Sequence, residues 1–195
     1  MTQANVVLYF FKTHFGAELS PIHEEFIMST AKKQNFKKKS LIFMEGDANT
    51  RHYIIEKGLL RLYLIDSKGK EINILFAKEN QVIGDLATPT ATNFYLETIE
   101  DSVVYSYTEE QLQNILDFIA VDISMKPNNG IRRSYIHIQK RLVSILSKSA
   151  EENYLDFKKL NPDLIQRLPQ YLIAGYLGIS HEFLSKIIAR TTKTK

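Results

Sequence analysis

The stretch LPQYLIAGYLGISHEFLSKIIAR, residues 168–190, consists of two short apolar-faced segments on either side of one glycine. Pro169 suits the first turn of a helix, where its missing N–H costs nothing. Gly178 permits the left-handed backbone of a tight turn, and Ser180 is a natural N-cap for a second helix. The spacing predicts two helices that cross closely at Ala174, because a larger side chain there would wedge them apart.

The two predicted helices have distinct buried and exposed sides. Ile173 and Leu177 face inward on the first helix, as do Leu184, Ile187 and Ile188 on the second. This arrangement is the helix-turn-helix pattern, whose second helix enters the major groove of DNA. The outward side chains that could read base edges are His181, Glu182, Ser185 and Lys186. Glu182 can accept a hydrogen bond from the N4 amine of cytosine. The alternative interpretation of the two helices is an ordinary αα-hairpin whose polar face is solvated.

The charge of the chain is unevenly distributed. The 195 residues carry a net charge of +3. Residues 1–119 have 12 Lys and Arg against 16 Asp and Glu, a net −4, whereas residues 120–195 have 13 against 6, a net +7. This asymmetry indicates that only the C-terminal part faces a polyanion.

Composition excludes several classes of protein. A hydrophobic content of 44% is sufficient for real cores, and no run of 18 uncharged apolar residues or secretory signal is present. We therefore expect a cytoplasmic protein with no membrane partner. The absence of cysteine excludes disulfides, iron–sulfur clusters and thiolate zinc sites.

The N-terminal part changes its hydrophobic period near Lys39. Before it, apolar clusters at helical spacing and Pro21 predict one or two short helices. After it, SLIFMEGD, RHYIIEKG, LLRLYLIDSKGK, EINILFAKEN, NFYLETIE and SVVYSYT are β-prone runs. Their regular spacing predicts a β-roll or jelly roll, with Gly69 in a hairpin turn after Asp66. Thr108 and Gln111 form a capping-box pattern that opens a helix of about two turns, ending at Leu116.

A longer helix is predicted after Pro127-Asn128-Asn129-Gly130. One apolar stripe repeats at spacings of 4, 3, 4 and 3 and consists of Ile131, Tyr135, Ile138, Leu142 and Ile145. A second face carries Ile136, Val143 and Leu146. The stripe either packs inside a single core or meets its own copy across a two-fold axis.

In this order, these elements resemble the CRP/FNR family of bacterial transcription regulators. The resemblance rests on FMEGDANTRHYIIEKGLLRLY (43–63), QVIGDL (81–86) and LIAGYLGISHEFLSKI (172–187). It implies an α+β protein with an N-terminal double-stranded β-helix (a jelly roll like the cyclic nucleotide-binding domain) in residues 1–120. A dimerisation helix in 121–148 and a helix-turn-helix domain in 149–195 would follow. The implied partners are double-stranded DNA, a second copy, RNA polymerase and a small-molecule effector of unknown identity.

The effector region departs from cyclic nucleotide-binding members of the family. By resemblance the pocket comprises Gly84, Asp85, Leu86, Asn93, Phe94 and Tyr95. Those members have Gly-Glu followed by an arginine that grips the cyclic phosphate. Here Asp85 follows Gly84, and residues 84–107 contain neither Arg nor Lys. Because a buried phosphate without a cation is costly, we expect that cyclic AMP is not the effector, unless Arg132 or Arg133 supplies the charge.

The second departure lies at the C-terminal end, where the wing of the family is truncated. The chain stops five residues after Arg190, so other residues would have to contact the phosphates. The candidates are Arg167, Gln170, Tyr171, Ser180, Arg190 and Lys193.

Other functions find less support in the sequence. The histidines show no metal-binding spacing, and neither a nucleophile elbow nor a phosphate loop occurs. We therefore expect that the protein is not an enzyme and has no metal and no cofactor. A haem would need an axial ligand, and His52 is the one histidine within a predicted strand of the roll. The aromatic residues of the roll could line a pocket or simply form its core. The remaining alternative is an effector-sensing or protein-interaction module whose helical tail does not bind DNA.

Overall fold

The computed structural model describes residues 5–16, 18–48, 51–85, 91–122 and 129–193. The chain divides into two compact units, of which the first comprises residues 1–62 and 76–134. The second comprises residues 63–75 and 135–195. The three-part division at 120 and 148 stays a prediction.

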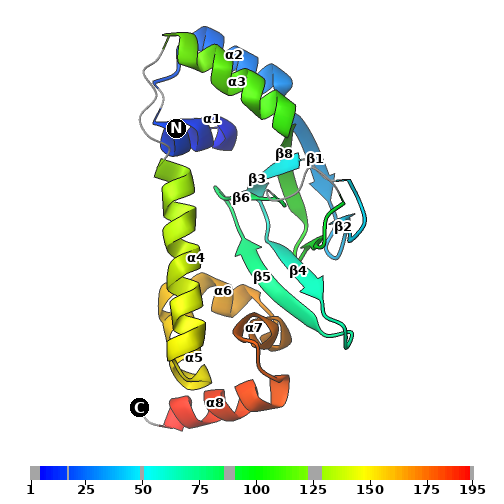
Figure 1. Ribbon diagram of the computed structural model, residues 1–195, viewed down its shortest axis with the longest axis vertical. Coiled ribbons are helices and arrows are strands. Elements are labelled where there is room, and N and C mark those ends of the chain that lie inside the picture. The colour runs from blue at the N-terminus through cyan, green and yellow to red at the C-terminus, as the bar shows by residue number, and fades with distance from the viewer. Residues whose placement is uncertain (1–4, 17, 49–50, 86–90, 123–128, 194–195) are drawn as a thin grey trace. The chain divides into compact units, whose positions relative to one another are not determined.

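Helices and strands follow one another as an α+β protein (Figure 1). The strands are β1 (Lys32–Phe36), β2 (Leu41–Phe43), β3 (Arg51–Lys57), β4 (Leu60–Ile65), β5 (Glu71–Ala77), β6 (Val82–Ile83), β7 (Tyr95–Thr98) and β8 (Ser102–Thr108). The helices are α1 (Val6–Phe15), α2 (Pro21–Thr30), α3 (Glu109–Asp122), α4 (Asn129–Ser147), α5 (Ala150–Leu160), α6 (Pro162–Arg167), α7 (Gln170–Leu177) and α8 (His181–Lys193).

The strands form two four-stranded sheets. Their orders are β1-β8-β3-β6 and β2-β7-β4-β5. Antiparallel pairing joins β1 to β8, with Lys32 opposite Ser106, and joins β3 to β8. The predicted β-roll is thus confirmed. Sequence reasoning missed β1, because KKQNF is polar and mostly exposed, and missed the two-residue strand β6.

Short helices cover one sheet of the roll. Figure 1 shows α2 and α3 side by side, and the rings of Phe26 and Phe118 lie 4.8 Å apart between them. Phe11 of α1, Ile27 of α2 and Ile115 of α3 are fully buried in one core with β3 and β8. The phenol of Tyr107 donates a 2.9 Å hydrogen bond to the Ile27 carbonyl. Burial raises the pKa of this phenol well above its ordinary value.

The hairpin between β4 and β5 has the predicted turn. Gly69 has a φ of 78° and donates its N–H to the Asp66 carbonyl over 2.9 Å. The Asp66 carboxylate accepts from the N–H groups of Lys68 and Lys70. These backbone donors hold the pKa of Asp66 below its ordinary value.

The capping box that opens α3 is confirmed. The Thr108 N–H donates to Gln111 Oε1 over 2.9 Å, and the Gln111 N–H donates to Thr108 Oγ1 over 3.1 Å. The predicted end at Leu116 was wrong, since α3 continues to Asp122. The reason is that Ile115 and Ile119 both have an apolar core to enter, which extends the helix beyond its opening turns.

Four short helices follow α4 in the second unit. Ser149 and Glu152 form a reciprocal capping box at the start of α5. Pro162 occupies the first turn of α6. The shared core of these helices is made of Tyr154, Phe157, Leu164, Leu168, Leu172, Ile173, Leu184 and Ile187. This core supports α7 and α8.

Candidate nucleic-acid interface and effector region

The turn between α7 and α8 has the geometry that its sequence predicts. Gly178 adopts the left-handed conformation, with φ 73° and ψ 18°, and its N–H caps α7 by donating to the Ala174 carbonyl. Ala174 is buried, as the close crossing requires. Pro169 is the N-cap of α7 and lies just before its first turn.

Hydrogen bonds cap the start of α8, and its inner side is packed in the core. Ser180 Oγ accepts from the Phe183 N–H over 3.2 Å, and the Ser180 carbonyl accepts from the Leu184 N–H over 3.0 Å. Leu184 and Ile187 are fully buried and Ile188 is half-buried. The predicted N-cap and inward face are therefore confirmed. A helix anchored in this way presents its other side as a rigid surface.

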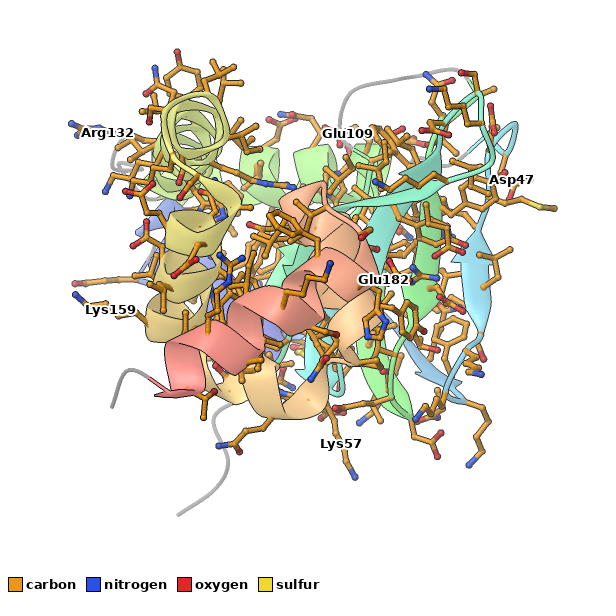
Figure 2. The ribbon with its side chains drawn as sticks, turned by 90° about the horizontal axis from the view of Figure 1, so that it is seen from below. Asp47, Lys57, Glu109, Arg132, Lys159 and Glu182 are labelled. Carbon is orange, nitrogen blue, oxygen red and sulfur yellow. The ribbon has the colours of Figure 1, made fainter. Side chains whose placement is uncertain are left out.

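The outer side of α8 is polar and open. His181, Glu182, Ser185 and Lys186 are all exposed, and Figure 2 shows Glu182 near the N-terminal end of α8. Ser185 Oγ donates to the His181 carbonyl over 3.0 Å. This side combines hydrogen-bond donors, acceptors and both signs of charge. Such a set can address the edges of bases in a major groove, and its role in base reading stays a proposal.

The Glu182 side chain has a pKa below its ordinary value. Hydrogen bonding to its own backbone N–H is the largest cause, followed by the Ser180 hydroxyl, and the charges of His181 and Lys186 act in the same direction. A depressed carboxyl pKa keeps the group ionised, so that at neutral pH Glu182 only accepts hydrogen bonds.

The residues predicted to contact phosphate differ in their exposure and in their existing contacts. Gln170 and Tyr171 are exposed at the start of α7, and Arg167 is half-buried at the end of α6. Ser180 is already engaged as the N-cap of α8. Arg190 Nη1 lies 3.9 Å from Glu151 Oε2, so this carboxylate competes with any phosphate. The side chain of Lys193 lies outside the described residues.

Sequence reasoning missed Phe183 as a surface residue of α8. Its ring is exposed, although its neighbours on the inner side are buried. An exposed aromatic ring next to polar reading residues can contact the methyl group of thymine. The sequence analysis assigned Phe183 to neither side of the helix, although its place one residue before the buried Leu184 indicates the surface.

The apolar stripe of α4 is uncovered within the chain. Tyr135, Ile138, Leu142 and Ile145 are exposed, and the side chain of Ile131 lies outside the described residues. Ile136, Val143 and Leu146, on the second face, are exposed as well. The alternative in which the stripe packs inside a single core therefore fails for these four residues. Exposed apolar area of this extent is typical of an interaction surface.

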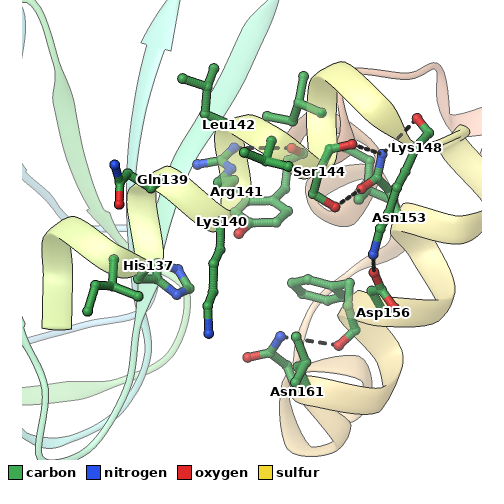
Figure 3. A pocket seen from close by; sticks show the side chains of 17 residues that line it. His137, Gln139, Lys140, Arg141, Leu142, Ser144, Lys148, Asn153, Asp156 and Asn161 are labelled. Carbon is green, nitrogen blue, oxygen red and sulfur yellow. Dashed lines mark hydrogen bonds and ion pairs between the residues drawn. The ribbon is translucent and has the colours of Figure 1, made fainter.

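A groove of about 810 Å³ runs along the same helix (Figure 3). Its walls come from α4, α5 and α7 and include Leu142 and Ile145 of the stripe. Phe157 and Tyr176 also line it, with ring centroids 5.2 Å apart. Ser144 Oγ donates to Asn153 Oδ1 over 2.5 Å at the α4–α5 crossing. The groove continues the uncovered apolar surface of α4.

The predicted effector region is held together by its own polar groups. Asp85 is buried and accepts a 2.6 Å hydrogen bond from the buried hydroxyl of Thr92. The same hydroxyl accepts from the Phe94 N–H over 3.1 Å. Asn93 is exposed, Phe94 and Tyr95 are half-buried, and Leu86 lies outside the described residues. This pair supplies no cation to an anionic ligand.

The roll contains a buried ion pair that sequence reasoning missed. Arg61 of β4 is only 5% exposed, and its Nε and Nη2 lie 2.7 Å and 2.6 Å from Glu97 Oε2 of β7. A lone arginine in the apolar run LLRLYL was the available signal. The sequence-based expectation of a cation concerned residues 84–107 and the long helix and did not include β4. Glu97 already neutralises the guanidinium.

The other side chains of the roll that were considered for binding a ligand are paired with a neighbour or buried. His52 Nε2 lies 2.5 Å from Glu109 Oε2. Phe43, Tyr53, Tyr63 and Phe76 are buried, which fits the interpretation that most roll aromatics form its core. Among the described residues, no group of three or more His, Cys, Asp or Glu is placed to hold a metal ion. No helix in the described part of the chain is long and apolar enough to cross a membrane.

Residues 33–117 match the family model of the cyclic nucleotide-binding domain. This match covers β1 to β8 and the first part of α3. A search of curated protein sequences finds no significant match to the chain. The roll is thus assigned by sequence as well as by fold.

Solved structures extend the likeness beyond the roll. FixK2 from Bradyrhizobium japonicum has a TM-score of 0.67 and 17% identity, covering 84% of this chain and 85% of that one. The global regulator CLP of Xanthomonas campestris, described as responsive to c-di-GMP, has a TM-score of 0.67 and 12% identity over 90% and 93%. CooA from Carboxydothermus hydrogenoformans has a TM-score of 0.64 and 14% identity over 98% and 86%.

These comparisons define a class. The chain has a cyclic nucleotide-binding-like roll followed by helices, and its structural neighbours are CRP/FNR-type regulators. The likeness to the CRP/FNR family that the sequence indicated is confirmed at the level of the fold, and for the roll by the family model as well.

Proposed function

We propose that the protein is a homodimeric, sequence-specific DNA-binding transcription regulator. The observation that carries the proposal is the state of α8: its inner side is fixed by Leu184 and Ile187, while its outer side exposes four side chains suited to base edges. The basic excess of residues 120–195 supports a polyanionic partner. Two copies would present two such helices to successive major grooves.

The α4 stripe is the proposed dimer surface, and the roll is the proposed sensor. A second copy would cover Tyr135, Ile138, Leu142 and Ile145, which this chain leaves exposed. The buried Asp85–Thr92 pair and the neutralised Arg61 support an effector other than cyclic AMP. Such a regulator would act in the cytoplasm, together with RNA polymerase, and would have no catalytic role.

Selection of bound fragments from a random duplex pool tests the function. We expect a palindrome, because it would reflect the two-fold symmetry of the dimer, with half-sites about one helical turn apart. Binding should weaken with salt at a log–log slope steeper than about −4, because several phosphates exchange counterions for Lys and Arg. No enriched sequence, together with salt-independent binding, would exclude the regulator.

A second candidate is a module whose helical tail binds a protein. The exposed Phe183 and the open groove along α4 favour it, because both offer apolar contact area. In that case duplex DNA should bind with a shallow salt slope and without sequence preference.

A further inference from the structure

Arg141 of α4 connects three elements of the second unit. Its Nη1 donates to the Ile74 carbonyl. Its Nη2 donates to the carbonyls of Asn73 and Tyr176, over 3.1 Å and 3.2 Å. The guanidinium carbon also lies 4.0 Å from the centroid of the Tyr176 ring. One side chain thus holds β5 and α7 against α4.

The charge of Arg141 is satisfied by carbonyl groups. No carboxylate of the described residues pairs with it. Burial lowers the pKa of its guanidinium, yet an arginine remains charged at any ordinary pH. Directional hydrogen bonds from a charged planar group constrain geometry more closely than apolar packing does.

Asn73 makes a second connection between β5 and α7. Its side chain is 1% exposed, and its Nδ2 donates to the Leu172 carbonyl over 2.9 Å. Gly175 leaves the necessary space, because a Cβ at this position would lie 2.9 Å from Asn73 Nδ2. The strand and α7 are therefore closely packed at this point.

Arg141 lies beside the stripe proposed for dimerisation, on the side of α4 that contacts β5 and α7. It stands between Ile138 and Leu142, and its partner Tyr176 lies two residues before the Gly178 turn that leads into α8. The angle between the stripe and α8 thus depends on the contacts of Arg141. In a dimer this angle would determine the distance between the two copies of α8.

We propose that Arg141 and Asn73 are positioning residues that lock α7 to α4 and β5 and thereby set the half-site spacing that the dimer accepts. The inference rests on the proposed function and adds a determinant of specificity to it. The locked state leaves His181 and Lys186 exposed, so the contacts preorganise the reading helix and do not occlude it. Loosening them should let the protein bind spacings that it otherwise rejects.

The first experiment needs no DNA. Hydrogen exchange is measured on the full chain for Arg141→Met and for Gly175→Ala, with Lys140→Met as the control because Lys140 is an exposed neighbour on α4. We expect amides 172–177 and 71–74 to exchange about tenfold faster or more in the first two variants and to be unchanged in the control. Alanine favours a helix more than glycine does, so faster exchange in Gly175→Ala would reflect lost contact with Asn73. Unchanged exchange in both variants would overturn the lock.

The second experiment measures affinity for the selected palindrome with its half-sites moved by one or two base pairs. The wild type should lose about tenfold or more per inserted base pair, because α8 must rotate around the duplex to follow its half-site. Arg141→Met should lose most of this discrimination while its affinity for an isolated half-site stays within about twofold. Arg141→Lys should recover little, because lysine lacks the planar fork.

The two experiments separate the lock from the proposed function. Unchanged spacing discrimination in Arg141→Met would refute the positioning role, even with faster exchange. If no duplex binds with any spacing, the regulator and the spacing role fail together, while the exchange data still decide whether Arg141 holds α7.

Discussion

Glu182 stands at the N-terminal end of α8, where backbone N–H groups favour negative charge. Because these donors lower its pKa, it should stay ionised at every pH above its ordinary value of about 4.3. We expect Glu182→Ala to relax the choice of base at one position by about 1–3 kcal/mol. Competition binding with single-base variants of the selected site, repeated at two pH values between about 7.5 and 9, where no histidine changes charge, measures both the loss and its independence of pH.

Arg190→Ala is the matched control for Glu182→Ala. Arg190 is exposed near the C-terminal end of α8 and is expected to contact phosphate, so its removal should weaken specific and random duplexes alike. If Glu182→Ala also weakened both duplexes equally, Glu182 would not read a base.

At the scale of single elements, the uncovered stripe of α4 yields the most direct prediction. Leu142 is 56% exposed, so Leu142→Glu should fold normally as a monomer. It would place two like charges at a symmetric interface, and we expect at least tenfold weaker self-association. Sedimentation equilibrium measures the dissociation constant.

Leu146→Glu is the control for the stripe, because Leu146 is 77% exposed on the second face of α4. It should leave self-association nearly unchanged. The opposite ranking of the two variants would assign the dimer interface to the second face.

Elements with a strong local signal could be predicted from sequence, and those set by distant partners could not. Ser180, Gly178 and the pair Thr108–Gln111 act through neighbours in the chain, so their residue types reveal their roles. β1 carries the polar sequence KKQNF and is defined by pairing with β8, about 70 residues away. The role of Arg141 could not be predicted from sequence either, because its partners are backbone carbonyls, which every residue type has.

At the scale of the whole molecule, the roll has the fold of a nucleotide-binding domain without the expected cation in its cassette. Thr92 and Asp85 are hydrogen-bonded to each other there, and neither supplies a cation to a phosphate. We expect cyclic AMP at millimolar concentration to leave the melting temperature unchanged, since a ligand that does not bind the native state cannot stabilise it. Calorimetry provides the independent check, and saturable micromolar binding would refute the prediction.

The pairing of Arg61 with Glu97 means that the roll carries an internal counter-anion as part of its own strand β7. Glu97→Gln removes this negative charge while keeping the size of the side chain, and breaking a buried ion pair costs up to about 3–5 kcal/mol. A dissolved oxyanion such as sulfate could restore the balance. We therefore expect the melting temperature of this variant to recover with added sulfate more than that of the wild type, with chloride at equal ionic strength as the reference. In that variant an anion from solution would take the place of the charge that β7 supplies.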